Sequence, residues 1–427
     1  MNRRDRNERG ASPRDGDARS ASPTSGWGAF RHPNYQLFWT GQLLSLFGTW
    51  MQSVAQAWLV LRLSNSAWQV GAVTALQFAP VTLLGLVGGV VSDRVNKRRA
   101  LLVTQSCAAL QALALGLLTV SGHVTIAHVM VMATILGFVN AFDMPIRQSF
   151  VMEIVGRPDL MSAISFNSAA FNTARIVGPA IGGLLIARID VGALFLLNAA
   201  SFLAVLASLL GMRESTLFAG PRVPRDSLAA GLQAGLAVVR RDPLVRTAVL
   251  LVGGVATFGL NFGVLLPVMA RDVFKIGSSG FGLLMASAGV GSVTAGLALA
   301  TRPQRDPVRT MLLGGAGVAV LGLCFALSPP LHFLPLSVAL LFGTGFSMIS
   351  LTATANNLVQ QRASDELRGR VLSVYLTAFA ASVPLGGLFA GGLARWKGAP
   401  FAWACGAVLS GVAVLWAAWE LRRTRRR

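Results

Sequence analysis

Gly89-Val-Val-Ser-Asp93-Arg94-Val-Asn96-Lys97-Arg98-Arg99 places one acidic and four basic side chains between two long apolar runs, 67–91 and 100–120. Each run is long enough for a membrane-spanning helix, which needs about 20 mainly apolar residues. So short a connection cannot carry five charged side chains into lipid, so it is predicted to lie at a membrane face. The excess of Arg and Lys indicates the cytoplasmic face, because loops on that side are enriched in these residues.

The composition of the whole chain also indicates a membrane protein. Of the 427 residues, 53% are hydrophobic and 13% are charged, with a mean hydropathy of +0.60, whereas soluble domains hold about 25% charged residues. The net charge of +20 lies mostly in the chain ends and short connections, where membrane orientation accounts for it, so nucleic acid is not an expected partner. Cys107, Cys324 and Cys405 lie in apolar segments without metal-ligand spacing, and we expect no metal, cofactor or disulfide framework.

Twelve apolar segments are long enough to cross a membrane. If the N-terminus is cytoplasmic, 30 of the 37 Lys and Arg residues fall in cytoplasmic segments and six in external loops. This bias predicts a multi-pass protein with both termini in the cytoplasm. The predicted spans are 34–61, 67–91, 100–120, 126–146, 162–187, 193–212, 246–270, 281–300, 309–328, 333–354, 371–394 and 399–421.

The chain is predicted to divide into two six-helix halves, 34–212 and 246–421, joined by a central cytoplasmic loop, 213–245, with an amphipathic helix over 227–241. Residues 1–33 are predicted to form a disordered cytoplasmic tail, because they are polar and lack the apolar region of a signal peptide. Residues 422–427 form a basic cytoplasmic tail. The segment 302–309 is a degraded counterpart of 89–99, and such repeated halves are common in secondary transporters.

Polar side chains recur at helical spacing inside several predicted spans. Residues three or four positions apart share one helix face, and a polar face inside a membrane must contact protein or water. It can line a water-filled cavity or hold helices together by hydrogen bonds, and the spacing alone leaves both readings open. The candidate cavity residues of this kind are Gln42, Ser45, Thr49, Gln52 and Gln56 in span one, Asn140 and Asp143 in span four, Asn261 in span seven, and Ser347, Ser350 and Thr354 in span ten.

Arg175 lies well inside the apolar run predicted as span five. Arg at a helix centre costs about 2.5–3.5 kcal/mol on insertion scales, so Arg175 is expected to face a cavity, a substrate or an acidic partner. Asp143 is the acidic candidate that topology brings nearest. Just after Arg175 come Gly178, Pro179, Gly182 and Gly183, where the proline is expected to kink the helix and the glycines to permit close helix packing.

The spacing G-x-x-x-D-R-x-x-K-R-R, together with its place between spans two and three, resembles the signature loop of the major facilitator superfamily of transporters. The resemblance implies an all-α membrane protein of twelve transmembrane helices in two pseudo-symmetric halves. It also implies a cavity lined by spans one, four, seven and ten, and a transporter rather than an enzyme. Asp93 would dock at the start of span eleven, near Arg370, and close the cavity on the cytoplasmic side. The other members of this gating loop are Gly89, Arg94, Lys97 and Arg98.

A narrower resemblance covers most of the chain. Residues 142–150, 167–183 and 365–371 resemble the branch of transmembrane secretion effectors that includes the enterobactin exporter. This implies export of a siderophore, drug or metabolite across a bacterial inner membrane. The run 178–183 resembles the antiporter signature of such exporters, although Ala174 stands where that signature has Gly. Asn96 likewise replaces a Gly of the loop, and we expect it to adopt the left-handed conformation that Asn tolerates.

Two other functions remain open at this stage. The same fold could take up a metal chelate or small nutrient, because direction is set by gradients. An intramembrane enzyme acting on lipid would need a catalytic cluster, and His32, His123, His128 and His332 do not have the spacing of one. The chain has no phosphate-binding G-x-x-x-x-G-K-[ST] motif, so gradient-driven transport is favoured. The expected partners of the monomer are a small-molecule substrate, the lipid bilayer and a proton or other coupling ion.

Overall fold

The computed structural model describes residues 27–218, 228–301, 304–331, 333–363 and 367–425, and these are helical, with no strand among them. Residues 1–26 of the predicted tail 1–33, part of the central loop and Asp365 lie outside the described residues. The long helices are α1 Pro33–Ser64, α2 Ala67–Arg94, α3 Lys97–Val120, α4 Ile126–Gly211, α6 Pro243–Gly259, α8 Gly277–Thr301, α9 Pro307–Leu327, α10 Leu334–Arg362, α11 Arg368–Lys397 and α12 Ala399–Arg425. The shorter elements are η1 Gly28–Arg31, η2 Glu214–Thr216, α5 Leu228–Arg241, α7 Phe262–Val268, the π-turn η3 Met269–Val273 and η4 Pro329–Leu331.

These elements make twelve membrane crossings, as the sequence predicted. The 86-residue α4 supplies three, because its backbone leaves the helical conformation at Gly156 and Asp190, where φ is 70° and 66°. The elements α6, α7 and η3 together supply one crossing. By length and hydropathy, the described residues hold nine membrane-spanning candidates, with α4 counted once. The remaining crossing is α1, whose Gln and Ser side chains lower its hydropathy.

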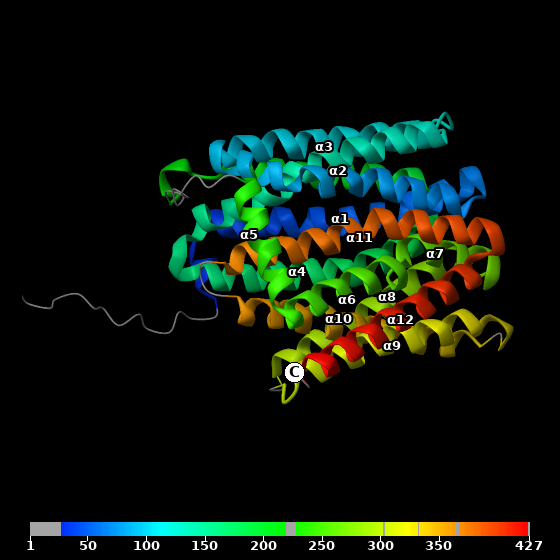
Figure 1. Ribbon diagram of the computed structural model, residues 1–427. Coiled ribbons are helices and arrows are strands. Elements are labelled where there is room, and N and C mark those ends of the chain that lie inside the picture. The colour runs from blue at the N-terminus through cyan, green and yellow to red at the C-terminus, as the bar shows by residue number, and fades with distance from the viewer. Residues whose placement is uncertain (1–26, 219–227, 302–303, 332, 364–366, 426–427) are drawn as a thin grey trace, which may run out of the picture.

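The helices run alternately up and down between two ends of the bundle (Figure 1). We call one the basic end; it carries the connection between α2 and α3, the elements η2 and α5, and the connection between α10 and α11. We call the other the opposite end; it carries the connection between α1 and α2, the break at Asp190 and the turn between η3 and α8.

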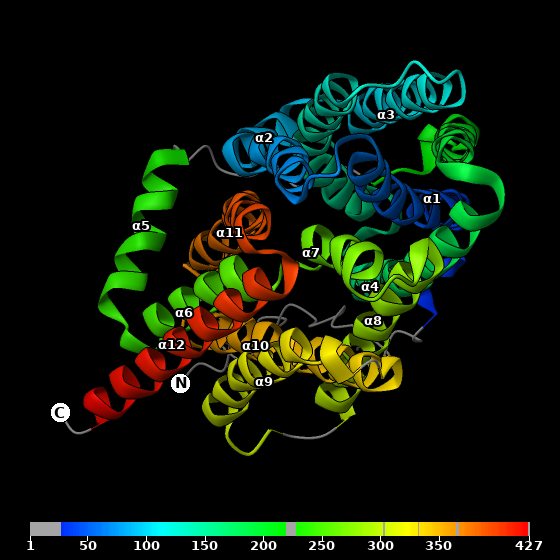
Figure 2. The same ribbon diagram turned by 90° about the vertical axis from the view of Figure 1, so that its right-hand side faces the viewer.

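The helices α1–α4 form one half of the bundle and α6–α12 the other (Figure 2). The halves meet where α2 packs on α11 and where the middle segment of α4 packs on α8. Small residues permit these approaches: a Cβ added to Gly71 would lie 2.2 Å from the carbonyl oxygen of Gly387. The contacts between halves therefore depend on backbone proximity, as is usual where helices pack inside a membrane.

The structure differs from the sequence-based prediction at two places near the basic end. Residues Trp27–His32 are ordered, because Trp27 and Phe30 pack on Phe166 and the Ala29 amide donates to Ser162 Oγ at 3.2 Å. Asn96 is not left-handed: with φ −68° and ψ 109° it is the N-cap of α3 and accepts a hydrogen bond from the Arg99 amide. An N-cap Asn satisfies a helix donor that would otherwise be unpaired.

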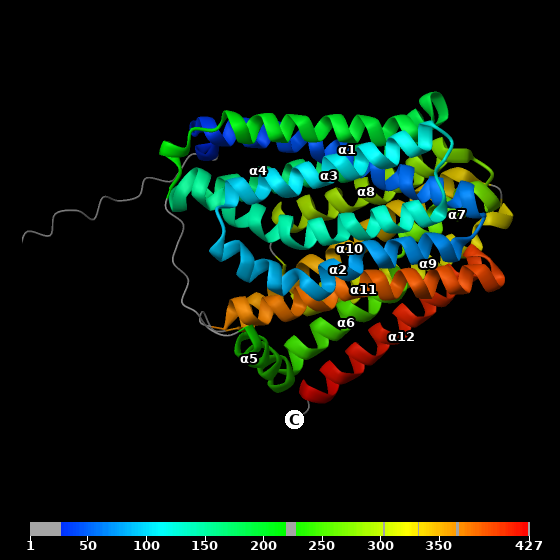
Figure 3. The same cartoon turned by 90° about the horizontal axis from the view of Figure 1, so that it is seen from above.

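The amphipathic segment predicted over 227–241 is the helix α5. It lies across the basic end, against α6 and the start of α11 (Figure 3). The contact with α11 is close, since a Cβ added to Gly235 would lie 2.5 Å from the carbonyl oxygen of Arg370. Any movement of the start of α11 must therefore move α5 or break this contact.

Candidate functional site

A cavity of about 370 Å³ lies between the two halves. It is bounded by α1, α2, the middle segment of α4, α6, α7, α8, α10 and α11. The wall is mainly apolar, with five aromatic side chains: Trp50, Phe78, Phe262, Phe281 and Phe379. Its polar members are Ser53, Gln56, Thr74, Gln77, Arg175, Asn261, Ser292 and Ser382. A mainly apolar wall with a few polar groups is the usual form of a small-molecule site.

Among the described residues, Arg175 is the charged side chain of this wall, since no Asp, Glu or His lines the cavity. The side chain is partly buried, and its Nη2 atom is buried without a hydrogen-bond partner. Within the described residues, Arg175 forms no ion pair. A desolvated guanidinium without an acceptor is unfavourable, so the site is preorganised to attract a negative or strongly polar group.

Gln56 and Gln77 form a polar pair on the same wall. Gln56 Nε2 donates to Gln77 Oε1 at 2.7 Å, which links α1 to α2. Across the cavity, Asn261 lies at the break between α6 and α7, where Leu260 leaves the helical conformation. Its Nδ2 donates to the Thr257 carbonyl at 2.9 Å and so satisfies one acceptor that the break exposes. The break also brings the consecutive residues 260–264 to the wall.

The other predicted cavity residues lie outside this wall. In α1, Gln42, Ser45 and Gln52 are buried, whereas Thr49 is exposed. Gln52 Oε1 accepts from Asn198 Nδ2 at 2.7 Å and its Nε2 donates to Gln111, so this part of the stripe holds α1 to α3 and α4. In α10, Ser347, Ser350 and Thr354 are buried within the C-terminal half, with Ser347 against Gly317 of α9. Asn140 in α4 is partly buried.

Asp143 does not pair with Arg175. Its carboxylate is 1% exposed and accepts hydrogen bonds from Thr104 Oγ1 at 2.6 Å and Gln105 Nε2 at 2.7 Å, and it forms an ion pair with Arg147. The pairing with Arg147 follows from helix geometry, because residues four apart share a face. The charge of Asp143 is therefore compensated inside the N-terminal half and cannot compensate Arg175.

The residues predicted for helix packing lie at contacts of α4 with α1 and α8. A Cβ added to Gly178 would lie 2.6 Å from the Cβ of Trp50, and one added to Gly182 would lie 3.2 Å from the Cα of Met51. Gly183 faces the other half, with Ser278 O 2.5 Å from its ideal Cβ. Pro179 is buried between them. This segment thus holds one wall of the cavity against both halves.

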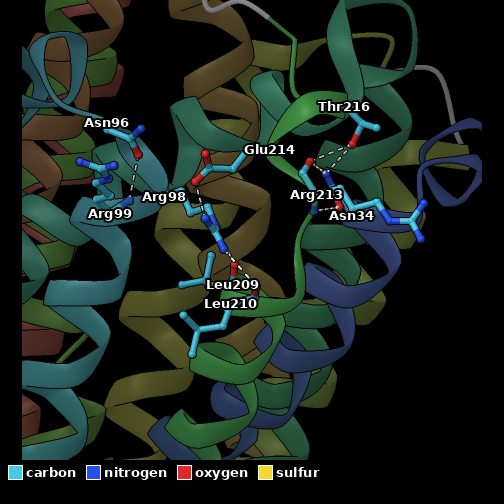
Figure 4. A network of polar contacts seen from close by, with 9 residues as sticks. All are labelled: Asn34, Asn96, Arg98, Arg99, Leu209, Leu210, Arg213, Glu214 and Thr216. Atoms are coloured by element: carbon cyan, nitrogen blue, oxygen red, sulfur yellow. Dashed lines mark hydrogen bonds and ion pairs between the residues drawn. The ribbon is translucent and has the colours of Figure 1, made fainter.

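At the basic end, the predicted gating loop is anchored to its own half. Arg98 Nε donates to the Leu209 carbonyl at 2.7 Å and Nη2 to the Leu210 carbonyl at 3.0 Å, and Arg98 also pairs with Glu214 (Figure 4). A cation at these carbonyls is favourable because they are the unpaired acceptors at the end of α4. Lys97 forms an ion pair with Glu153 at 2.6 Å.

Asn34 reinforces this anchor. Its Oδ1 accepts from the Arg213 amide at 3.0 Å, while its Nδ2 donates to the Arg213 carbonyl at 2.9 Å, which ties the start of α1 to the end of α4 (Figure 4). Asp93 and Arg94 end α2 and are exposed, and within the described residues Asp93 forms no ion pair or hydrogen bond. Gly89 has open space beside it, and Arg370 lies in the first turn of α11. The docking of Asp93 on α11 therefore stays a prediction.

At the opposite end, Arg271 joins the two halves. Its Nη1 donates to the Leu61 carbonyl at 2.7 Å and to Asn65 Oδ1 at 2.9 Å. Asn65 is the C-cap of α1 and has φ 49°, a left-handed conformation that Asn adopts more readily than most residues. These two hydrogen bonds hold the halves together at the opposite end.

Sequence reasoning did not single out Arg271, Asn34, Trp50 or Gln77. Gln77 had a detectable signal, since it and Gln69 are the two amide side chains of the apolar run 67–91. Arg271 had no such signal, because a single arginine in a predicted external connection has the same local pattern as any other. The partners of Arg271 lie more than 200 positions away, at the end of α1, and local sequence does not identify them.

The comparisons with known proteins agree with this geometry. The family model described as transmembrane secretion effector matches residues 24–426. The multidrug efflux pump Tap of Mycolicibacterium fortuitum is 30% identical over 81% of this chain and 86% of its own length. The enterobactin exporter EntS of Escherichia coli is 26% identical over 92% and 94%, and the staphyloferrin A transporter of Staphylococcus aureus is 27% identical over 82% and 87%.

Solved structures show the same fold at low sequence identity. A bacterial homologue of the human lysosomal transporter Spinster, in an inward-facing and occupied conformation, superposes with a TM-score of 0.68 at 16% identity, covering 92% of this chain and 97% of its own. The POT family transporter PepTSo gives 0.74 at 11% identity, with coverage of 92% and 98%.

Proposed function

The chain belongs to the transmembrane secretion effector family of the major facilitator superfamily, and on that basis we propose that it exports a small organic molecule across the bacterial inner membrane by alternating access. One observation carries the proposal: a cavity of about 370 Å³ lies between two six-helix halves, and Arg271 joins these halves at one end of the bundle. Two of the named relatives are an efflux pump and an exporter, and no observation favours uptake.

The orientation of the transporter follows from charge. The basic end carries the connections rich in Arg and Lys, and such connections lie on the cytoplasmic side. We therefore place both termini in the cytoplasm and the Arg271 contact at the periplasmic surface. We propose that in this orientation the structure is the inward-facing state, in which the Arg271 contact closes the periplasmic side and a cytoplasmic molecule can be taken up.

Export then requires exchange of one closure for the other. The contacts at the opposite end separate, and the basic end closes as Asp93 approaches the start of α11. A carboxylate there interacts favourably with the positive end of the helix. Among the described residues no acidic side chain lines the cavity, so a coupling proton would have to be carried elsewhere or by the substrate. We propose that the monomer is the working unit, because the cavity is formed within one chain.

Metabolite profiling tests the direction of transport. A strain that lacks the gene is compared with the same strain carrying the wild-type gene or the Asp93→Asn variant, at matched membrane expression. Export predicts that an organic molecule accumulates in the cytoplasm of the deletion strain and is restored to the medium by the wild-type gene. A molecule that enters the cytoplasm only when the protein is present would show uptake, and identical profiles in all strains would refute the transport function.

A further inference from the structure

Resting on the proposed export function, we infer that the substrate is an amphipathic organic anion. One acidic group of the molecule faces Arg175, and its aromatic or aliphatic body lies against the apolar wall. The inference depends on the charge balance of the cavity, the unused donors of Arg175 and the aromatic side chains beside it.

The charge balance favours an anion over a cation. Arg175 is the formal charge of the cavity wall in the part of the chain that the structure describes. The nearest acidic residue expected from topology, Asp143, is occupied by Arg147, Thr104 and Gln105. A cationic substrate would be repelled without a carboxylate to offset Arg175, whereas an anion would lower the free energy of both partners.

The geometry of Arg175 specifies the acidic group further. Its Nη2 atom is buried and has no acceptor, and a buried donor left unpaired is costly. A purely structural arginine would donate to carbonyls or side chains of neighbouring helices, as Arg98 does at the basic end. A guanidinium presents donors in a planar fork that matches a carboxylate or sulfonate. The substrate therefore supplies the missing acceptor.

The rest of the cavity wall is suited to bind the apolar body of the substrate. Trp50 lies one turn from Ser53 on α1, and Phe262, Phe281 and Phe379 come from three helices of the other half. Aromatic walls bind flat or branched apolar groups through large contact areas. A cavity of about 370 Å³ is at the small end of the roughly 300–1,000 Å³ range of ligand pockets. A small inorganic anion would leave most of this apolar wall without contacts.

Calorimetry with a matched pair of probes tests the inference. Purified protein in lipid nanodiscs is titrated with 2-naphthoate and with 2-naphthamide, which share a shape but differ by one charge, and empty nanodiscs correct for partition into lipid. We expect naphthoate to bind the wild type about tenfold more tightly, which is the usual effect of one charge-assisted hydrogen bond. Equal binding of the two probes, or no binding of naphthoate at millimolar concentration, overturns the inference.

Variants locate the preference. Arg175→Gln should bind both probes equally, Arg175→Lys should keep part of the preference, and Arg175→Glu should instead favour 2-naphthylmethylammonium. The matched control is Arg188→Gln, an exposed arginine near the end of the same α4 segment, which should keep the full preference. If the Gln variant is not monodisperse, the two probes on wild-type protein still decide the question.

The outcomes also separate the ligand class from the function. Binding is measured without a gradient, so an intact anion preference with no export in cells would refute the proposed function and leave the ligand class standing. Export that persists in the Arg175→Gln strain, together with equal binding of the probes, would refute the ligand class and leave the exporter standing.

Discussion

Removing the side chain of Arg271 should release the closure at the opposite end. In the structure Arg271 Nη1 donates to the Leu61 carbonyl at 2.7 Å and to Asn65 Oδ1 at 2.9 Å, and both acceptors belong to the other half. The Leu61 carbonyl keeps its bond from the Asn65 amide at 3.0 Å when Arg271 is lost. The Arg271→Ala variant therefore loses contacts between the halves without leaving a buried acceptor unpaired.

The expected magnitude follows from these two bonds. The Arg271 side chain is 26% exposed, so each bond is taken near the lower limit of its class. A charge-assisted bond to the Leu61 carbonyl then contributes about 1.5 kcal/mol and the exposed bond to Asn65 about 0.5 kcal/mol. Their sum of about 2 kcal/mol shifts the equilibrium between the two states about 30-fold toward opening. Asn65→Gly removes the weaker bond while keeping the left-handed conformation of this C-cap, and should shift the equilibrium about twofold.

Distances between spin labels measure this shift. His123 and Lys397 are both exposed at the opposite end and lie in different halves. Each is changed to Cys and spin-labelled, in a protein whose native Cys107, Cys324 and Cys405 are changed to Ala. Arg271→Ala should increase the population at long distance, Asn65→Gly should do so slightly, and Arg395→Ala, which changes an exposed arginine at the same end, should not. A folded Arg271→Ala protein with the wild-type distance distribution would refute the closure.

Three further changes test other parts of the structure. Asp93→Asn should leave the melting temperature unchanged, because Asp93 is exposed and forms no ion pair within the described residues, yet lower export strongly; wild-type export at equal expression would remove Asp93 from the mechanism. Gly183→Val should force α4 from α8, since its Cβ meets Ser278 O at 2.5 Å, and so shift the spin-label distances toward opening, whereas Gly85→Val, with no atom within 4 Å, should not. Arg147→Ala should destabilise the N-terminal half by about 3 kcal/mol, because it leaves the buried carboxylate of Asp143 without its cation. Its melting temperature in detergent should fall, and Arg147→Ala combined with Asp143→Asn should recover most of the loss; an unchanged melting temperature in the single variant would contradict the pairing.

The twelve crossings were predictable because hydropathy is a local property. An apolar run long enough to span the bilayer has few alternatives in lipid, where every backbone polar group must be paired within the helix. The ends of the helices were less predictable. The prediction ended span ten at residue 354, whereas α10 continues to Arg362, because a helix that leaves the lipid can keep its backbone hydrogen bonds in water. The sequence also did not predict that Trp27–His32 are ordered. Their partners, Phe166 and Ser162, lie far away in the sequence, on α4.

The site was only partly predictable. A polar helix face in a membrane must avoid lipid, but the sequence does not tell whether it contacts another helix or a cavity. The stripe on α1 divides: Gln52 is held by Gln111 and Asn198, 59 and 146 positions away, while Gln56 reaches the cavity and pairs with Gln77. Both are glutamines one turn apart, so their sequence environments do not separate them. The packing of α3 and α4 decides which amide is used for structure.

The same reasoning explains why Arg175 is the strongest candidate for substrate recognition. Its presence in an apolar segment could be read from the sequence, but three interpretations were open: a cavity, a substrate or an acidic partner. The structure assigns Asp143 to Arg147 and gives Arg175 no acceptor among the described residues. A buried donor without a partner in the protein gains its hydrogen bond only when a ligand binds, so that bond contributes to the affinity. In a transporter this is where specificity can be built, because an interaction already satisfied within the protein contributes nothing to binding.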